Sequence, residues 1–194
     1  FRFGHKGLGS GEKLLSACRK AGIPCIVVPQ LKLGGITVSS THIRDLIQMG
    51  LVEHAIHFLG HPHILTGTVV PGHQLGRRMG FPTANILLPE GLAVPKFGVY
   101  VCRCRVDGVS YPTVTNVGTR PTVDGIGITV ESWILDYSGD LYGREITLEF
   151  YKFLRPELKF PNLEALRQAV VRDGEKTKAI LKGLTCNPGN FVVK

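Results

Sequence analysis

One segment combines evenly spaced glycines, positive charge and two small polar side chains. Its candidate functional residues are Gly72, Gly76, Arg77, Gly80, Pro82, Thr83 and Asn85. Glycines at this density allow backbone N–H groups to approach a phosphate closely, and the arginine adds positive charge. We therefore predict a phosphate-binding loop here. It differs from the G-x-x-x-x-G-K-[ST] loop, which occurs nowhere in the chain.

The end of this segment offers ligands for a divalent cation. If residues 81–85 are extended, Thr83 and Asn85 project from the same face of the backbone. A hydroxyl and an amide oxygen suit Mg²⁺ that is shared with the phosphates of ATP. On spacing alone, an ordinary turn with local side-chain hydrogen bonds is the competing interpretation.

Glu131 is the candidate for acid–base chemistry. In a strand predicted over residues 128–137 it shares a face with Thr129, Trp133 and Leu135, and this face is otherwise largely apolar. A carboxylate in such a place costs free energy unless it is compensated, so its presence indicates a function. The alternative is an edge-strand glutamate that leans into solvent.

Short apolar–polar alternations dominate the chain from residue 64 onward. They predict strands over 64–70, 99–106, 111–117, 128–137 and 145–153, separated by turns rich in Gly, Pro and Asp. This pattern favours a mainly β fold, a small closed antiparallel barrel of Greek-key type. Residues 163–181 have helical spacing and predict an amphipathic helix that closes the barrel.

The first 60 residues have a different pattern. They predict a helix over 11–21, a turn, a buried parallel strand at 25–28, a helix from Ser40 as N-cap through residue 49, and a helix over 52–59. We place the boundary near residue 62. The predicted domains are an incomplete α/β piece over 1–62, the barrel with its helix over 63–184, and a tail over 185–194.

Composition limits the class of protein. The net charge of +8 suits an anionic partner, but the 23 basic residues are dispersed and are not interleaved with stacking aromatics. A non-catalytic basic barrel that binds RNA or nucleotide is the competing hypothesis.

The five cysteines are scattered without a C-x-x-C pair, which favours reduced structural thiols, and Cys102 and Cys104 should pack in the core. No apolar run is long enough for a membrane span or signal peptide, so we expect a cytoplasmic protein.

The segment 72–85 resembles the G-x-x-x-G…G-[FI]-P-T-A-N signature of riboflavin kinases. The resemblance continues in order through residues 98–100, 116–122, 130–131, 141–143 and 153–157. It implies a barrel that holds Mg²⁺-ATP through Thr83 and Asn85. It also implies transfer of the γ-phosphate to the 5′-hydroxyl of riboflavin to give FMN, with Glu131 as catalytic base.

The same resemblance implies four further contacts. Ile134 and Tyr142 would touch the nucleotide, and Arg155 and Phe160 would close over the flavin. From the residues alone, Arg155 could instead pair with Glu157, and Phe160 could pack ahead of a helix that begins near Asn162. Some family members have lysine where this chain has Leu158, which leaves a phosphate contact there in doubt. A module that binds FMN without chemistry is a third hypothesis, and it would not need Glu131.

The beginning of the chain resembles a second enzyme domain. Residues 1–7 are similar to the end of the D-F-R-F-G motif of FMN adenylyltransferases, and Ser40, Thr41 and Arg44 belong to a segment similar to their S-S-T-x-I-R motif. We therefore expect a fragment of a Rossmann-like nucleotidyltransferase domain, with more chain upstream in the natural protein. The H-x-G-H segment of that domain is absent, so FAD synthesis is expected only of a longer chain. The expected partners are ATP, riboflavin and FMN, with no nucleic acid and no membrane, and we expect a monomer.

Overall fold

The computed structural model describes residues 2–72, 76, 80–122 and 125–184. The chain divides into two compact units, residues 1–38 and residues 39–194. The predicted boundary near residue 62 was placed where the sequence pattern changes, and it stays a prediction. Residues 39–62 nevertheless belong to the same compact unit as the barrel.

The first unit is small and built from local contacts. Strands β1 (Arg2–Phe3) and β2 (Gly9–Ser10) pair across the short helix η1 (His5–Gly7), and α1 (Gly11–Lys20) follows. Ser10 caps α1 by accepting a hydrogen bond from the N–H of Lys13. Strands β3 (Lys32–Leu33) and β4 (Ile36–Thr37) form a hairpin.

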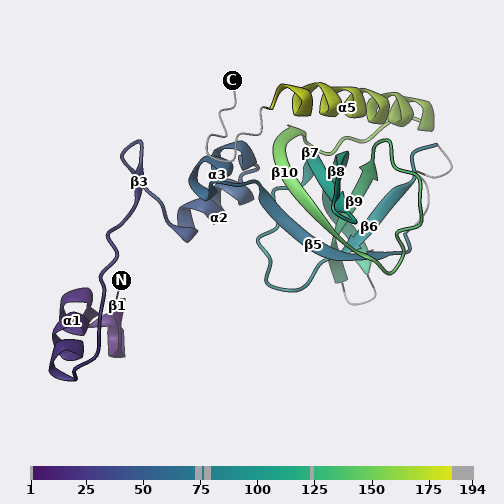
Figure 1. The fold of residues 1–194 in the computed structure, drawn as a ribbon. Helices are drawn as coiled ribbons and strands as arrows, with labels where there is room; N and C mark the ends of the chain where they lie inside the picture. Colours follow the sequence, from purple (N-terminus) through teal and green to yellow (C-terminus); the bar gives the residue numbers. More distant parts are fainter. Residues whose placement is uncertain (1, 73–75, 77–79, 123–124, 185–194) are drawn as a thin grey trace. The chain divides into compact units, whose positions relative to one another are not determined.

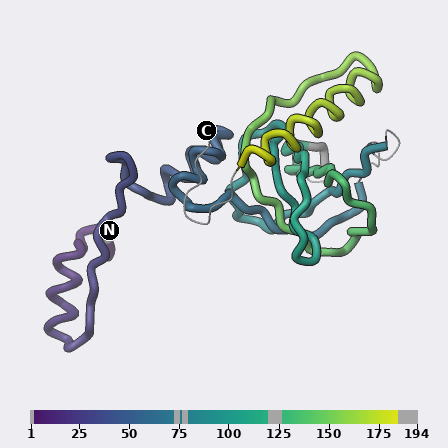
Figure 2. Tube along the Cα trace, turned by 45° about the horizontal axis from the view of Figure 1, so that its top comes forward, coloured from purple at the N-terminus to yellow at the C-terminus, as the bar shows by residue number. Residues whose placement is uncertain are grey.

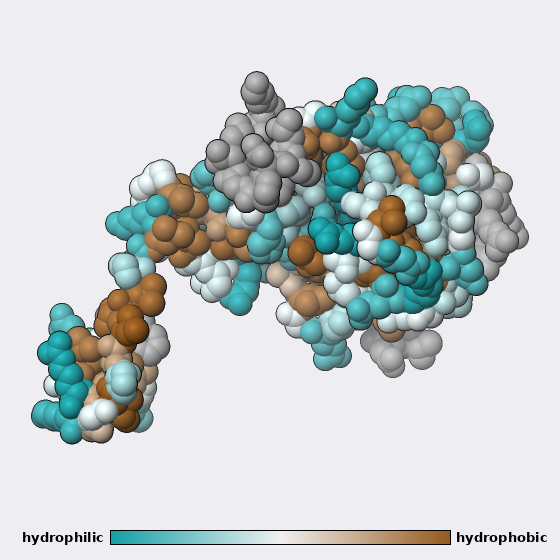
Figure 3. Space-filling model, in the orientation of Figure 1, coloured by the Kyte–Doolittle hydropathy of each residue, from teal (hydrophilic) through white to brown (hydrophobic). Residues whose placement is uncertain are grey.

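The predicted parallel strand in this unit is wrong. Residues 25–28 have no regular structure, and Ile26 and Val28 are 89% and 81% exposed. A strand needs a neighbour about 4.8 Å away to pair its N–H and C=O groups, and none of the described strands pairs with this segment. The unit therefore presents hydrophobic surface (Figure 3). The assignment of residues 1–62 to a Rossmann-like fragment stays a prediction.

The second unit begins with two short helices, α2 (Ser40–Gln48) and α3 (Val52–Leu59). Ser39, not Ser40, is the N-cap of α2, because its side chain accepts the N–H of His42 at 3.2 Å. Gly60 ends α3 in the left-handed conformation, with φ 76°. Helix α3 packs on the barrel strands that follow.

Six antiparallel strands close the barrel, in the order β10-β5-β6-β9-β8-β7 (Figure 1). Their bounds are β5 (His63–Val70), β6 (Thr83–Leu87), β7 (Gly98–Val106), β8 (Val109–Thr122), β9 (Gly125–Ile134) and β10 (Glu145–Arg155). Strands β7, β8 and β9 are consecutive hairpins, and β10 returns beside β7. This is the Greek-key order, so the predicted barrel is confirmed.

The barrel interior is filled by alternate residues of its strands. Tyr100, Cys102 and Cys104 of β7 are fully buried there, beside Leu148 and Phe150 of β10. Burial raises the pKa of the Cys104 thiol to about 12, and that of Cys102 is also raised. Both thiols therefore stay protonated and serve as apolar core groups, as predicted.

The closing helix α5 (Leu163–Gly183) runs along the outside of the barrel, as the views in Figures 1 and 2 agree. Asn162 caps it by accepting the N–H of Ala165 at 2.8 Å. It packs mainly on β8 and β7. Among the helices that the structure describes, none is long and apolar enough to cross a membrane. The predicted tail at 185–194 lies outside the described residues.

Candidate active site

The pleat of β6 and β9 sorts their side chains into two sets. Ala84 of β6 and Val130 and Ile134 of β9 lie in the barrel core. Because alternate residues of a strand point to opposite faces, Thr83, Asn85 and Glu131 lie on the outer face. Thr83 and Asn85 thus share a face of an extended segment, as the sequence indicated.

The strand register places three polar residues in one row across the barrel wall. Asn85 of β6 is directly opposite Glu131 of β9, and Glu131 is directly opposite Asn116 of β8. Directly opposite residues in antiparallel strands have Cβ atoms about 4.5–5.5 Å apart and point to the same face. The proposed metal ligand and the proposed base, 46 residues apart in the sequence, are therefore neighbours.

Glu131 is half-buried, and its carboxylate has no hydrogen bond or ion pair to another side chain in the part of the chain that the structure describes. Its neighbours on β9, Thr129 and Trp133, share its face. Leu135, just beyond the end of β9, packs with Trp133, Val99 and Val114. Apolar residues thus lie along the same face of the chain, but the residues directly opposite Glu131 on both neighbouring strands are asparagines.

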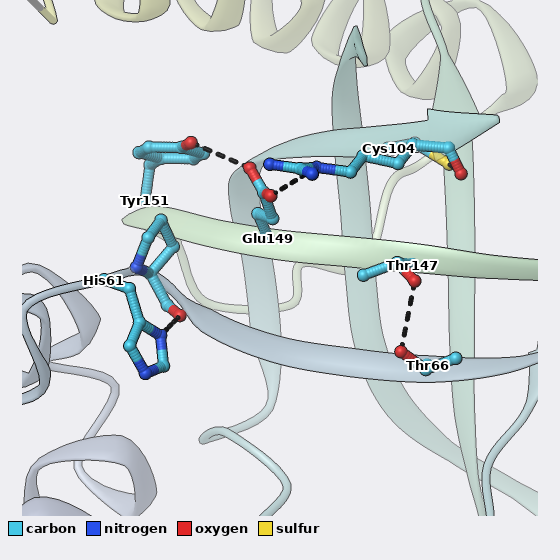
Figure 4. A network of polar contacts seen from close by, with 8 residues as sticks. His61, Thr66, Cys104, Thr147, Glu149 and Tyr151 are labelled. Carbon is cyan, nitrogen blue, oxygen red and sulfur yellow. Dashed lines mark hydrogen bonds and ion pairs between the residues drawn. The ribbon is translucent and has the colours of Figure 1, made fainter. Parts of the chain in front are cut away.

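Glu149 provides an internal contrast (Figure 4). It is also a glutamate of the barrel wall, but its carboxylate is 2.7 Å from Nε of Arg105 and accepts the hydroxyl of Tyr151 at 2.9 Å. Strands β5 and β6 on one side, and β7 and β8 on the other, separate β10 from β9. Glu149 is therefore a paired structural carboxylate, away from the row that contains Glu131.

The glycines of the 72–80 segment have two different roles in this structure. A Cβ at Gly72 would overlap the side-chain amide of Asn85, and one at Gly76 would overlap the carbonyl oxygen of Phe81 and lie 3.2 Å from the side chain of Thr83. Gly80 has a φ of 85°, which favours glycine for its backbone conformation. Gly72 thus lies directly against Asn85, and Gly76 lies close to Thr83, the two proposed metal ligands. Arg77 lies outside the described residues.

A cavity of about 560 Å³ opens beside Thr83 and Asn85. Of the predicted nucleotide-binding residues, it is lined by Gly72, Pro82, Thr83, Asn85, Ile134 and Tyr142. This volume is in the range of small-ligand pockets, about 300–1,000 Å³. Glu131, Arg155 and Phe160 do not line the cavity, and neither do Ser40, Thr41 and Arg44, which belong to α2.

One wall of the cavity was missed from the sequence. It is the loop after β9, residues 137–141, which includes Tyr137, Ser138, Gly139 and Asp140. Asp140 accepts the N–H of Tyr142 at 3.0 Å, so it shapes the loop that presents Tyr142. The turn-forming run Ser-Gly-Asp was the available signal, but turns of this kind occur in many loops without a ligand.

The end of β10 lies on the other side of the polar row. Arg155 pairs with Asp173 of α5 at 2.7 Å, so the anticipated alternative of a pair with Glu157 is wrong. Glu157 instead accepts a hydrogen bond from Asn116 at 3.1 Å. The Arg155 guanidinium lies 5.7 Å from the centre of the Phe160 ring. The two predicted flavin contacts therefore touch one another, and their contact with a flavin stays a prediction.

Two known proteins with similar sequences have the same name. The chain is 38% identical over 181 residues to the bifunctional riboflavin kinase/FMN adenylyltransferase of Pseudomonas fluorescens, covering 93% of this chain and 58% of the relative. It is 35% identical over 185 residues to the protein of that name from Listeria monocytogenes, covering 95% of this chain and 59% of the relative. The chain thus spans under two thirds of the length of these curated relatives.

A solved structure has a similar fold. It is a crystal structure from Streptococcus pneumoniae described as a macrolide-efflux protein, which superposes with a TM-score of 0.82 at 31% identity and covers 92% of this chain and 57% of that one. The family description that matches residues 59–181 is Flavokinase: Riboflavin kinase. That match includes the whole barrel and most of α5, so the chain belongs to the riboflavin kinase family.

Proposed function

We propose that this chain transfers the γ-phosphate of Mg²⁺-bound ATP to the 5′-hydroxyl of riboflavin and so produces FMN and ADP. The observation that carries the proposal is the register that sets Asn85, which lines the cavity of about 560 Å³, directly opposite Glu131. Phosphoryl transfer depends on alignment and on neutralisation of charge. A metal ligand next to an unpaired carboxylate is suited to that task.

Glu131 accepts the proton of the 5′-hydroxyl as this oxygen attacks the γ-phosphorus, while the bond from that phosphorus to the bridging oxygen of ADP breaks. The unpaired carboxylate and its partly apolar surroundings support this role. Ile134 and Tyr142 line the cavity and would hold the nucleotide. Arg155 and Phe160 would border the flavin, because Asn116 connects their segment to the row that contains Glu131.

The residues fit a magnesium ion. Thr83 and Asn85 present a hydroxyl and an amide oxygen on one face, and Asn85 is only 7% exposed and is held against Gly72. Hard oxygen donors of this kind are typical of Mg²⁺ sites that are completed by substrate phosphates and water. Bound there, the ion would neutralise charge on the phosphates.

The aromatic residues do not favour a nucleic-acid barrel. Tyr100 and Phe150 are fully buried in the barrel, and Tyr151 is 6% exposed. Trp133 packs edge-to-face on Phe81, with ring centroids 4.7 Å apart. Tyr100, Phe150 and Tyr151 are therefore too buried for a base to stack on them. We propose a monomeric cytoplasmic enzyme that acts on small molecules, and FAD synthesis only in a longer chain that completes the site around Ser40, Thr41 and Arg44.

Incubation with riboflavin, ATP and Mg²⁺, followed by chromatography of the flavins, tests the proposal. FMN should accumulate with the wild-type chain and only at the background rate with Glu131→Gln. Glu149→Gln is the matched control, because it alters a paired glutamate of the same barrel: it should lower the melting temperature and leave kcat near the wild-type value. Absence of FMN with a folded wild-type chain would refute the proposal.

A further inference from the structure

The guanidinium of Arg155 is extensively bonded within the protein. Its Nε and Nη2 donate to the same oxygen, Oδ2 of Asp173, at 3.0 and 2.7 Å, and its Nη1 donates to the carbonyl oxygen of Pro156 at 3.1 Å. Three of its five N–H groups are therefore used by the fold. The side chain is fixed in position at the point where β10 ends.

Asp173 is the partner that fixes it. It is 4% exposed, and a carboxylate is seldom this buried unless it is paired. The next residue, Gly174, lies against Trp133, because a Cβ there would be 2.7 Å from the indole ring. Helix α5 thus approaches the barrel closely at this turn. Asp173 binds Arg155, and Gly174 packs against Trp133.

The segment after Arg155 borders the proposed base. Glu157 accepts a hydrogen bond from Asn116 and lies against Gly118, where a Cβ would overlap its carboxylate. Asn116 is in turn directly opposite Glu131. Asp173 thus contacts Arg155, and two residues further along the chain Glu157 contacts Asn116 in the row that contains the base.

We propose that Asp173 is a positioning residue for the riboflavin side of the site, and that it acts through Arg155 on residues 156–160. The inference rests on the proposed function and deepens it. Asp173 is a buried residue of α5 and lines no part of the described cavity, so it is not placed to touch a substrate itself. Its effect is to keep the segment beside Asn116 in one conformation.

The proposal predicts different effects on the binding of the two substrates. Thr83 and Asn85 belong to β6 and lie beside Gly76 and Gly72, not in the segment after β10. Loss of Asp173 should therefore weaken riboflavin binding and leave Mg²⁺-ATP binding close to the wild-type value. A purely structural role would lower the melting temperature without this difference between the substrates.

Asp173→Asn in the full chain is the primary test, with Asp136→Asn as its matched control. Asp136 forms an exposed ion pair with Lys178 of the same helix at 2.7 Å, and asparagine tolerates its φ of 61°. Arg155→Lys is the second variant, because lysine keeps a positive charge opposite Asp173 but lacks the planar guanidinium with its fixed N–H donors. The readouts are the riboflavin Kd from quenching of flavin fluorescence, the Mg²⁺-ATP Kd from calorimetry, and the melting temperature.

We expect Asp173→Asn and Arg155→Lys each to raise the riboflavin Kd about tenfold or more, with the Mg²⁺-ATP Kd within about twofold. Asp136→Asn should change neither. The double variant, Asp173→Asn with Arg155→Lys, should have a riboflavin Kd no higher than that of the single variants, because both substitutions interrupt the same contact. Unchanged riboflavin binding in folded Arg155→Lys, or additive losses in the double variant, would overturn the inference. Wild-type protein that fails to bind riboflavin would instead refute the proposed function.

Discussion

Gly72→Ala is the substitution that most directly tests the proposed metal site. The three heavy atoms closest to an added Cβ, Nδ2, Cγ and Oδ1, all belong to the side chain of Asn85. No left-handed φ is required at Gly72, so alanine is compatible with the backbone. The substitution therefore acts on Asn85 without altering its chemistry.

The size of the displacement follows from the contacts. Oδ1 of Asn85 would lie 2.8 Å from the new Cβ, whereas ordinary contacts begin at 3.4 Å, so the oxygen must move by at least about 0.6 Å. Nδ2 and Cγ of the same amide lie closer to the new Cβ and must move further. Distances at a metal site tolerate about 0.2 Å. Asn85 is 7% exposed and has little space to rotate. We expect Asn85 to be lost as a metal ligand. The affinity for Mg²⁺ should then fall by about 10- to 100-fold, which is the usual effect of mutating a residue that orients a metal ligand.

A titration of Mg²⁺ at fixed ATP and riboflavin, with FMN formation as the signal, measures the effect. Gly183→Ala is the matched control, since Gly183 has open space around its Cβ position and no positive φ. The Mg²⁺ midpoint should rise for Gly72→Ala and stay constant for Gly183→Ala. A Gly72→Ala protein with the wild-type midpoint would mean that the loop yields and that Asn85 is not held by it, which refutes the reasoning.

Three further predictions concern other parts of the chain. Glu131→Gln should lower kcat by about 10²- to 10⁴-fold with unchanged melting temperature, and near-normal turnover would remove Glu131 from the mechanism. Burial lowers the pKa of His63 below its usual 6.5, so the unfolded chain binds more protons and stability should fall as the pH drops through 6.5. Denaturant unfolding at pH 7.5 and 5.5 should show a smaller loss for His63→Gln, and equal losses in variant and wild type would contradict the assignment. The chain should convert no FMN to FAD, because it has Ser40 and Arg44 but no H-x-G-H segment; FAD detected by chromatography would show that the site is complete without it.

The barrel strands were predictable because their two faces differ. Tyr100, Cys102 and Cys104 alternate with less apolar neighbours, and the predicted strand over 99–106 differs from β7 by one residue. The short strand β6 was anticipated only as an extended stretch, because five residues after a proline carry little periodicity. Residues 25–28 show the opposite error: their apolar composition is typical of a buried strand, but pairing depends on neighbours that local sequence does not specify.

The candidate site was likewise predictable from the sequence only in part. Thr83 and Asn85 are two residues apart, so their shared face followed from the sequence once an extended segment was assumed. The pairing of Asn85 with Glu131 depends on register between distant strands, which no local pattern determines. The partner of Arg155 was missed, although Asp173 stands on the inward side of the predicted helix with Ala169 and Thr177, where a charged residue indicates a buried pair.

The geometry of the site is a consequence of the packing of the core. Ala84 and Val130 fill the barrel interior, and their sequence neighbours Asn85 and Glu131 form the row outside it. A shift of either strand by one residue would move the carboxylate into the apolar interior and expose its core neighbours, which costs several kcal/mol for the buried charge alone. The burial that stabilises the barrel therefore also excludes a register shifted by one residue, which would separate the proposed base from the proposed metal ligand. Substitutions that loosen the interior near Val130 should reduce turnover before they unfold the chain. The free energy needed to misalign Asn85 and Glu131 is smaller than the free energy of unfolding.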